Sequence, residues 1–113
     1  MRSLLQSNDH SFQPPWQPAV DIYRGDKEWL VKIDLAGVKQ DDIEVSTNNH
    51  LLTLKGHRRD FQVQEGHQTY SMEISYNRFE RVLELPFDTK GASIQTNYQD
   101  GMLFIRFQTQ EQS

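Results

Sequence analysis

Cysteine is absent from the sequence, which excludes a disulfide scaffold, a thiolate metal site and a thiol nucleophile. Long apolar runs are absent too: no stretch approaches the roughly 20 residues that a membrane-spanning helix needs. The pair Leu4-Leu5 is much shorter than the apolar core of a signal peptide. Together these absences predict a cytoplasmic protein without a membrane span.

An excess of positive charge is also missing. The net charge is −4, and the basic residues are dispersed except at His57-Arg58-Arg59. A nucleic-acid-binding domain ordinarily presents a stripe of Lys and Arg on one surface. We therefore expect no nucleic-acid partner.

The sequence has no residues arranged for catalysis or metal binding. Its four histidines are His10, His50, His57 and His67, and no cluster of carboxylates at ligand spacing accompanies them. No nucleophile-elbow or phosphate-loop pattern surrounds the Ser, His and Asp residues. We expect no metal, no cofactor and no enzymatic activity.

What the sequence does contain is alternation of apolar and polar residues at a period of two. Because successive side chains of a strand point to opposite faces, such a run has one face for the core and one for solvent. The alternating runs span residues 29–35, 43–47, 52–55, 72–76, 79–85, 94–98 and 102–107. Turn residues, mainly Gly and Asn, separate several of them. The pattern predicts an all-β protein, an antiparallel β-sandwich of about seven to nine strands.

The length of 113 residues and the hydrophobic content of 35% allow a single core. We assign residues 1–18 to a mobile N-terminal arm, residues 19–107 to the sandwich domain and residues 108–113 to a short polar tail. The arm is rich in Gln, Ser and Asn, as disordered segments are. Scattered through it are the apolar residues Leu4, Leu5, Phe12 and Trp16.

Five short phrases follow one another along the chain. They are Trp16-x-Pro18-x-Val20-Asp21-Ile22-Tyr23, Asp34-Leu35-Ala36-Gly37-Val38, Leu52-Thr53-Leu54-Lys55-Gly56, Phe79-Glu80-Arg81 with Leu85-Pro86, and Gly101-Met102-Leu103. In this order and spacing the sequence resembles the small heat-shock protein family, in its bacterial and plant branch, over about Trp16 to Phe107. The resemblance implies that residues 19–107 are an α-crystallin domain, a two-sheet antiparallel sandwich with immunoglobulin-like topology. It also implies an ATP-independent holdase that binds non-native client proteins and prevents their aggregation.

The chain departs from the family's pattern in four places. Ala36 stands where proline is common, Asn77 where glycine is common and Thr96 where alanine is common, and all three changes are tolerable locally. Fourth, family members usually carry an Ile-x-Ile motif in a C-terminal extension, which docks into a groove between sheet edges on a neighbouring dimer. Residues 108–113 contain no aliphatic side chain, so we expect that assembly link to be absent.

The segment from His57 to Thr69 contains an alternating run of its own, Phe61-Gln62-Val63-Gln64. In the bacterial and plant branch of the family this loop pairs with an edge strand of the partner subunit. The resemblance therefore implies a strand-swapped homodimer with Phe61 and Val63 in the interface. The alternative is an ordinary hairpin that folds on its own subunit.

Arg81 lies, by alternation, on the same strand face as Phe79 and Leu83. An unpaired guanidinium is costly to bury, so a carboxylate or backbone carbonyls must meet it. We place Arg81 in the dimer interface on this ground and by the resemblance. The alternative is a local twist that turns Arg81 to solvent.

Two apolar surfaces are candidates for client binding. One is the arm, through Leu4, Leu5, Phe12 and Trp16, with plain disorder as the alternative. The other is an apolar groove flanked by the strands around residues 43–45 and 79–85. Its candidate residues are Ile43, Val45, Phe79, Leu83 and Leu85.

Two other functions stay open. A CS-type co-chaperone adaptor shares the architecture and would be a monomer that binds an ATP-dependent chaperone, but it lacks the long loop and the Gly-x-Leu phrase. The other is an assembly partner of another small heat-shock protein, which the sequence does not separate from a holdase. A molar-mass measurement discriminates a monomer, a swapped dimer and a large shell.

Overall fold

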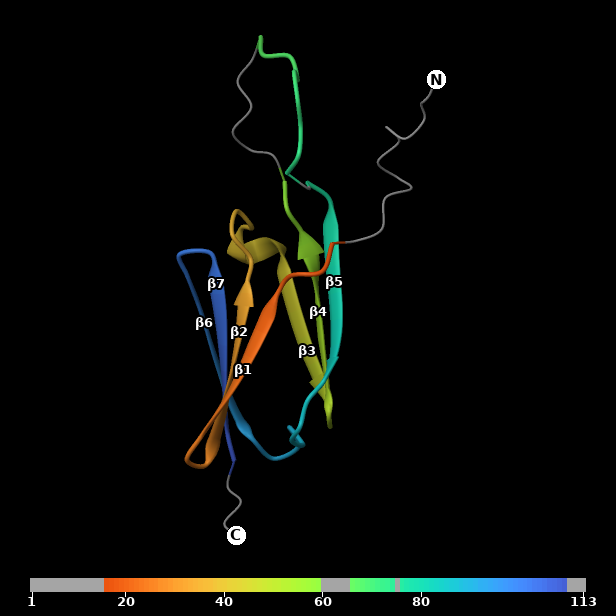
Figure 1. The fold of residues 1–113 in the computed structure, drawn as a ribbon. Helices are drawn as coiled ribbons and strands as arrows, with labels where there is room; N and C mark the ends of the chain where they lie inside the picture. Colours follow the sequence, from red (N-terminus) through yellow and green to blue (C-terminus); the bar gives the residue numbers. More distant parts are fainter. Residues whose placement is uncertain (1–15, 60–65, 75, 110–113) are drawn as a thin grey trace.

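The computed structural model describes residues 16–59, 66–74 and 76–109 of the chain. Within these residues it contains seven strands and one short 3-10 helix, as drawn in Figure 1. In chain order they are β1 (Val20–Gly25), β2 (Glu28–Asp34), η2 (Gln40–Asp42), β3 (Ile43–Asn48), β4 (Leu51–His57), β5 (Arg78–Glu84), β6 (Ser93–Gln99) and β7 (Met102–Gln108). The prediction of an all-β protein is confirmed.

The strands form two antiparallel sheets. One has the order β1-β2-β7-β6 and the other the order β3-β4-β5. The pairs β1–β2, β3–β4 and β6–β7 are hairpins with short turns, whereas the pairing of β2 with β7 joins Glu28 to Gln108. The chain crosses between the sheets after β2 and again after β5 (Figure 1). The predicted antiparallel sandwich is therefore confirmed.

The core lies between the two sheets and is built from alternate residues of the central strands. Six of the fully buried side chains lie on these strands: Val31, Ile33, Leu52, Leu54, Ile105 and Phe107. They belong to β2, β4 and β7, which have a neighbouring strand on both sides. Their neighbours in the sequence are more exposed, as the period of two predicts.

Two glycines are required where backbone segments approach each other closely. A Cβ on Gly56 would collide with the carbonyl oxygen of Asp42 and the ring of Phe79. Gly101 has a φ of +79°, and a Cβ there would lie 2.9 Å from the Cα of Ala36. Both positions fix how the connection between β2 and β3 lies against the rest of the molecule.

The alternating run at residues 72–76 does not form a strand in the part that the structure describes. Residues 66–74 and 76–77 belong to the long connection between β4 and β5, and residues 66–74 extend away from the sheets (Figure 1). Tyr70, Met72 and Ile74 on this connection are all exposed. Alternation alone does not make a strand, because the backbone groups of a strand need a hydrogen-bonded neighbour.

Candidate functional site

Residues 16–18, here called the strap, lie against the outer edge of β5. The Trp16 N–H donates to the carbonyl of Arg78 at 3.3 Å, and the Glu80 N–H donates to the carbonyl of Trp16 at 3.2 Å. This pair of bonds makes Trp16 a parallel bridge partner of Phe79. The strap therefore adds one residue of pairing to an edge strand that is otherwise bonded only to β4 in the described structure.

The indole of Trp16 lies in a site formed by Phe79 and Arg58, here called the seat. Its ring centroid lies 5.3 Å from that of Phe79 in a tilted arrangement. The guanidinium of Arg58 lies 4.2 Å from the centre of the indole, within the range of a cation–π contact. Arg58 also donates from Nη1 to the carbonyl of Ala36 at 3.1 Å, which ties the seat to the connection after β2.

This placement differs from the expected mobile arm. Trp16 is half-buried and packs against the core, and Pro18 is fully buried. The docked segment thus begins before the predicted boundary at residues 18 and 19. The other three candidate arm contacts, Leu4, Leu5 and Phe12, lie outside the described residues.

Arg81 meets the requirement that its charge have a partner. Its Nη1 donates to the carbonyl of Pro18 at 2.7 Å, and the guanidinium is partly buried. The partner is therefore a backbone carbonyl of the same chain, which also holds the end of the strap. The other predicted interface residues, Phe61 and Val63, lie outside the described residues.

The structure does not bring together the two strands that were expected to flank the groove. β3 and β5 lie on opposite edges of their sheet with β4 between them. Phe79 is 1% exposed and Leu85 is 2% exposed, so both are core residues. Ile43, Val45 and Leu83 are partly buried and pack against the same core. This part of the prediction was wrong because local alternation does not reveal the order of strands in a sheet.

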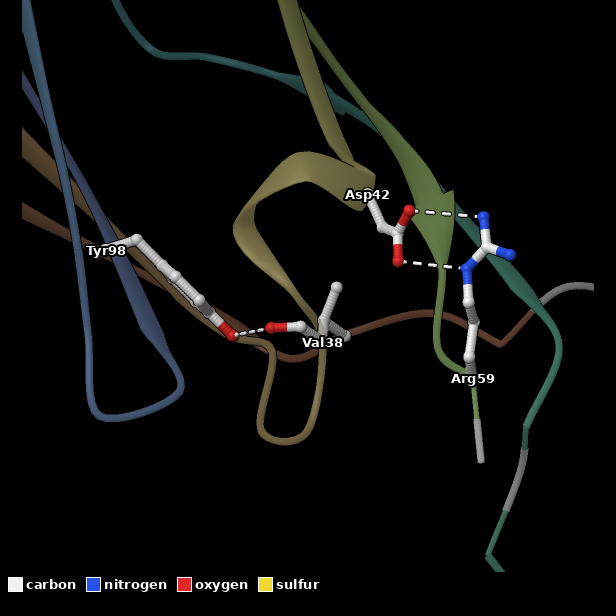
Figure 2. Close-up of polar contacts among 4 residues, drawn as sticks. All are labelled: Val38, Asp42, Arg59 and Tyr98. Atoms are coloured by element: carbon white, nitrogen blue, oxygen red, sulfur yellow. Dashed lines mark hydrogen bonds and ion pairs between the residues drawn. The ribbon is translucent and has the colours of Figure 1, made fainter. Parts of the chain in front are cut away.

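The edge strand that runs beside β3 is β6. Before β6, Thr89 donates from its N–H and its hydroxyl to the carbonyl of Asn49, just beyond β3. Near the other end of β6, the hydroxyl of Tyr98 lies 2.5 Å from the carbonyl oxygen of Val38, ahead of β3 (Figure 2). The edge strand next to β3 is thus β6, which carries the exposed Ile94, and not β5.

The connection between β2 and β3 is held from two sides. The hydroxyl of Tyr98 also lies 2.9 Å from the carbonyl oxygen of Leu35, and burial raises the pKa of this tyrosine. On the other side, Arg59 forms a bidentate pair with Asp42, with distances of 3.0 Å from Nε and 3.2 Å from Nη2 (Figure 2). Arg59 is largely exposed, so this pair contributes at most about 1 kcal/mol. Neither contact carries a signal in the local sequence.

Comparison with known proteins supports the β-sandwich fold described above. The family model described as Hsp20/alpha crystallin family matches residues 21–113. The chain belongs to this family. Its members are small heat-shock proteins, which are chaperones and not enzymes.

Individual relatives match most of the chain at moderate identity. Small heat shock protein C2 of Rickettsia felis is 28% identical over 95 residues, which are 84% of this chain and 62% of the relative. The structure of heat shock protein 16.0 from Schizosaccharomyces pombe superposes with a TM-score of 0.71 at 26% identity, covering 87% of this chain and 91% of that one. A small heat-shock protein from Xylella fastidiosa gives a TM-score of 0.70 at 26% identity, covering 88% and 92%.

The chain spans about three-fifths of the length of small heat shock proteins C2 and C4 of Rickettsia felis. Among the described residues, no helix is long and apolar enough to cross a membrane. The same residues contain no group of three or more His, Cys, Asp or Glu side chains that could hold a metal ion.

Proposed function

We propose that this protein is an ATP-independent holdase that binds partly unfolded proteins and prevents their aggregation. The observation that carries the proposal is the exposure of large apolar side chains on the connection between β4 and β5. Tyr70, Met72 and Ile74 are exposed by 101%, 50% and 58%. Exposed apolar side chains that lie close together are typical of a surface that binds other proteins. Membership of the small heat-shock protein family supports the same function.

We also propose a homodimer in which each subunit supplies the loop around Phe61 and Val63 to its partner. The support is an open edge: in the described residues β1 pairs only with β2, and its free side is a row of unpaired backbone groups. A strand from a second subunit would satisfy those groups. Arg81 already bonds to Pro18 of its own chain, so a dimer role for this residue would use its remaining donors.

Other small heat-shock proteins are proposed as further partners. The place proposed for an Ile-x-Ile segment from such a protein is along the edges of β3 and β6, where Ile43, Val45 and Ile94 lie. The solved relative from Xylella fastidiosa is described as having a distinct high order structure. The cytoplasmic location remains a prediction from the sequence.

Light scattering from a heat-labile client protein tests the holdase function. Without nucleotide, the protein at several-fold molar excess should suppress the client's aggregation, and added ATP should change nothing. Bovine serum albumin at the same mass concentration is the control for crowding. A CS-type adaptor or a pure assembly partner would leave the scattering curve unchanged, and that result would refute the proposal.

A further inference from the structure

Few hydrogen bonds hold the backbone of the strap on β5. Its backbone contributes the two bonds of Trp16, both longer than 3.1 Å, and the carbonyl of Pro18 accepts from Arg81. In a parallel ladder, the next residues that point their N–H groups at the partner strand are two positions away in each direction. Those positions are Pro14 and Pro18, and proline has no N–H. Of positions 14, 16 and 18, only Trp16 therefore has an N–H to donate to the edge of β5.

The indole of Trp16 is also imperfectly satisfied. Its Nε1 is buried and has no hydrogen-bond partner among the described residues. A buried donor without an acceptor loses the hydrogen bond that it makes with water in the released state. This unmade hydrogen bond weakens the docked state of the strap, although the indole contacts both Phe79 and Arg58.

The outer edge of β5 has backbone N–H and carbonyl groups to which the strap does not bond. Beyond Glu80, no backbone hydrogen bond to the outer edge of β5 occurs within the described residues. Val82, farther along this edge strand, is 56% exposed. An extended segment without proline would bond to the same carbonyl and N–H groups as Trp16 and continue along the strand.

We propose that this seat is a peptide-binding site that residues 16–18 occupy in the resting chain, and that an extended client segment carrying an aromatic side chain displaces them. The seat itself indicates the kind of occupant, because it holds an indole in contact with an aromatic ring and a guanidinium, beside an open strand edge. The inference rests on the proposed holdase function, for which it names one place where a client binds. Release of the strap is the conformational step that opens the place.

The two indole N–H resonances of the chain report on displacement, because the sequence contains only Trp16 and Trp29. The Trp29→Phe variant assigns the signals. The probe is a ten-residue peptide of Thr and Ser with one central Trp and no proline, and the matched peptide has Ala in place of Trp. The Trp peptide should move the Trp16 signal to the position of an exposed indole, whereas the Ala peptide should leave it in place.

Removing the Trp16 indole should raise the affinity of the seat for the Trp of the peptide. The Trp16→Ala variant should bind fluorescently labelled Trp peptide at least about three-fold more tightly than the wild type does. The reason is that the strap no longer lowers the population of the state in which the site is open. Gln17→Ala is the matched control, since Gln17 belongs to the strap but is exposed, and its affinity should equal that of the wild type. Circular dichroism confirms that each variant is folded, and displacement itself is measured on the wild type.

The outcomes separate this inference from the proposed function. If the Trp peptide binds while the Trp16 signal stays in place, or if both peptides bind equally, the seat is not the binding site. Suppression of client aggregation with an unmoved Trp16 signal would overturn the inference and leave the holdase function intact. Displacement of Trp16 by the Trp peptide without suppression would support the seat and refute the holdase function.

Discussion

At the position of Gly56 a hydrogen atom is the only substituent that fits. The residue pairs with Ile43 on one side and Phe79 on the other, and both the Asp42 carbonyl and the Phe79 ring lie where a Cβ would go. Relief would require movement of backbone or of a core ring, because Phe79 is fully buried. The seat of the strap depends on the same ring.

We expect Gly56→Ala to lower the free energy of unfolding by about 3 kcal/mol, since overpacking of a core costs this much when backbone is involved. Urea denaturation measures the change. Gly25→Ala is the matched control, because a Cβ at Gly25 meets only the flexible side chain of Glu28, and it should cost much less. Equal stability of the two variants would show that the β3–β4 region adapts freely.

Among the contacts between elements, Tyr98 joins β6 to the connection between β2 and β3. Its hydroxyl lies within hydrogen-bond distance of the carbonyls of Leu35 and Val38. Burial raises the pKa of Tyr98, and the negative charge of Asp34 acts in the same direction. The folded state therefore favours the neutral hydroxyl.

We expect a pH dependence with a definite sign. The stabilisation from neutral Tyr98 is present below the unfolded-state pKa of about 10 and is lost as the pH rises through the higher folded-state pKa. Tyr98→Phe should therefore be about 1 kcal/mol less stable than the wild type near pH 8, with a smaller gap near pH 11. Urea denaturation at both pH values checks this, with the fully exposed Tyr70→Phe as a control that shows no gap. A gap that grows with pH would contradict the assignment.

The elements also show what the sequence can and cannot predict. The central strands were predictable because one face of each is dry, so Val31 and Ile33 alternate with polar residues. The partner of Arg81 was predictable in kind, a carbonyl or carboxylate, but not in identity, because Pro18 is 63 residues away along the chain. The groove was misplaced for the same reason: which edges meet is decided by pairings between distant segments.

At the scale of the whole molecule, the proposed dimer depends on residues outside the described part of the chain. The alternation places Phe61 and Val63 on one face of the expected strand and Gln62 on the other. Deleting residues 60–64 should remove the strand that pairs with the partner's β1. Light scattering after size-exclusion chromatography should then give the mass of one shortened chain, a little below the 13.3 kDa of the full chain, where the wild type gives the mass of two full chains.

The control is Gln62→Ala, which leaves the apolar face intact and should remain dimeric. If the deletion variant is still a dimer at the same concentration, the subunits associate through another surface and the loop does not swap.

The pairing of β2 with β7 has a consequence for how the protein is made. The two strands lie side by side in the finished sheet, yet Asp34 and Gln108 are separated by roughly 70 residues, which a ribosome adds in about 4–15 s at about 5–20 residues per second. During that interval β2 has β1 on one side and no partner on the other, and it already carries Val31 and Ile33. The nascent chain thus displays an apolar, half-paired strand of the kind that we propose the finished protein protects in others.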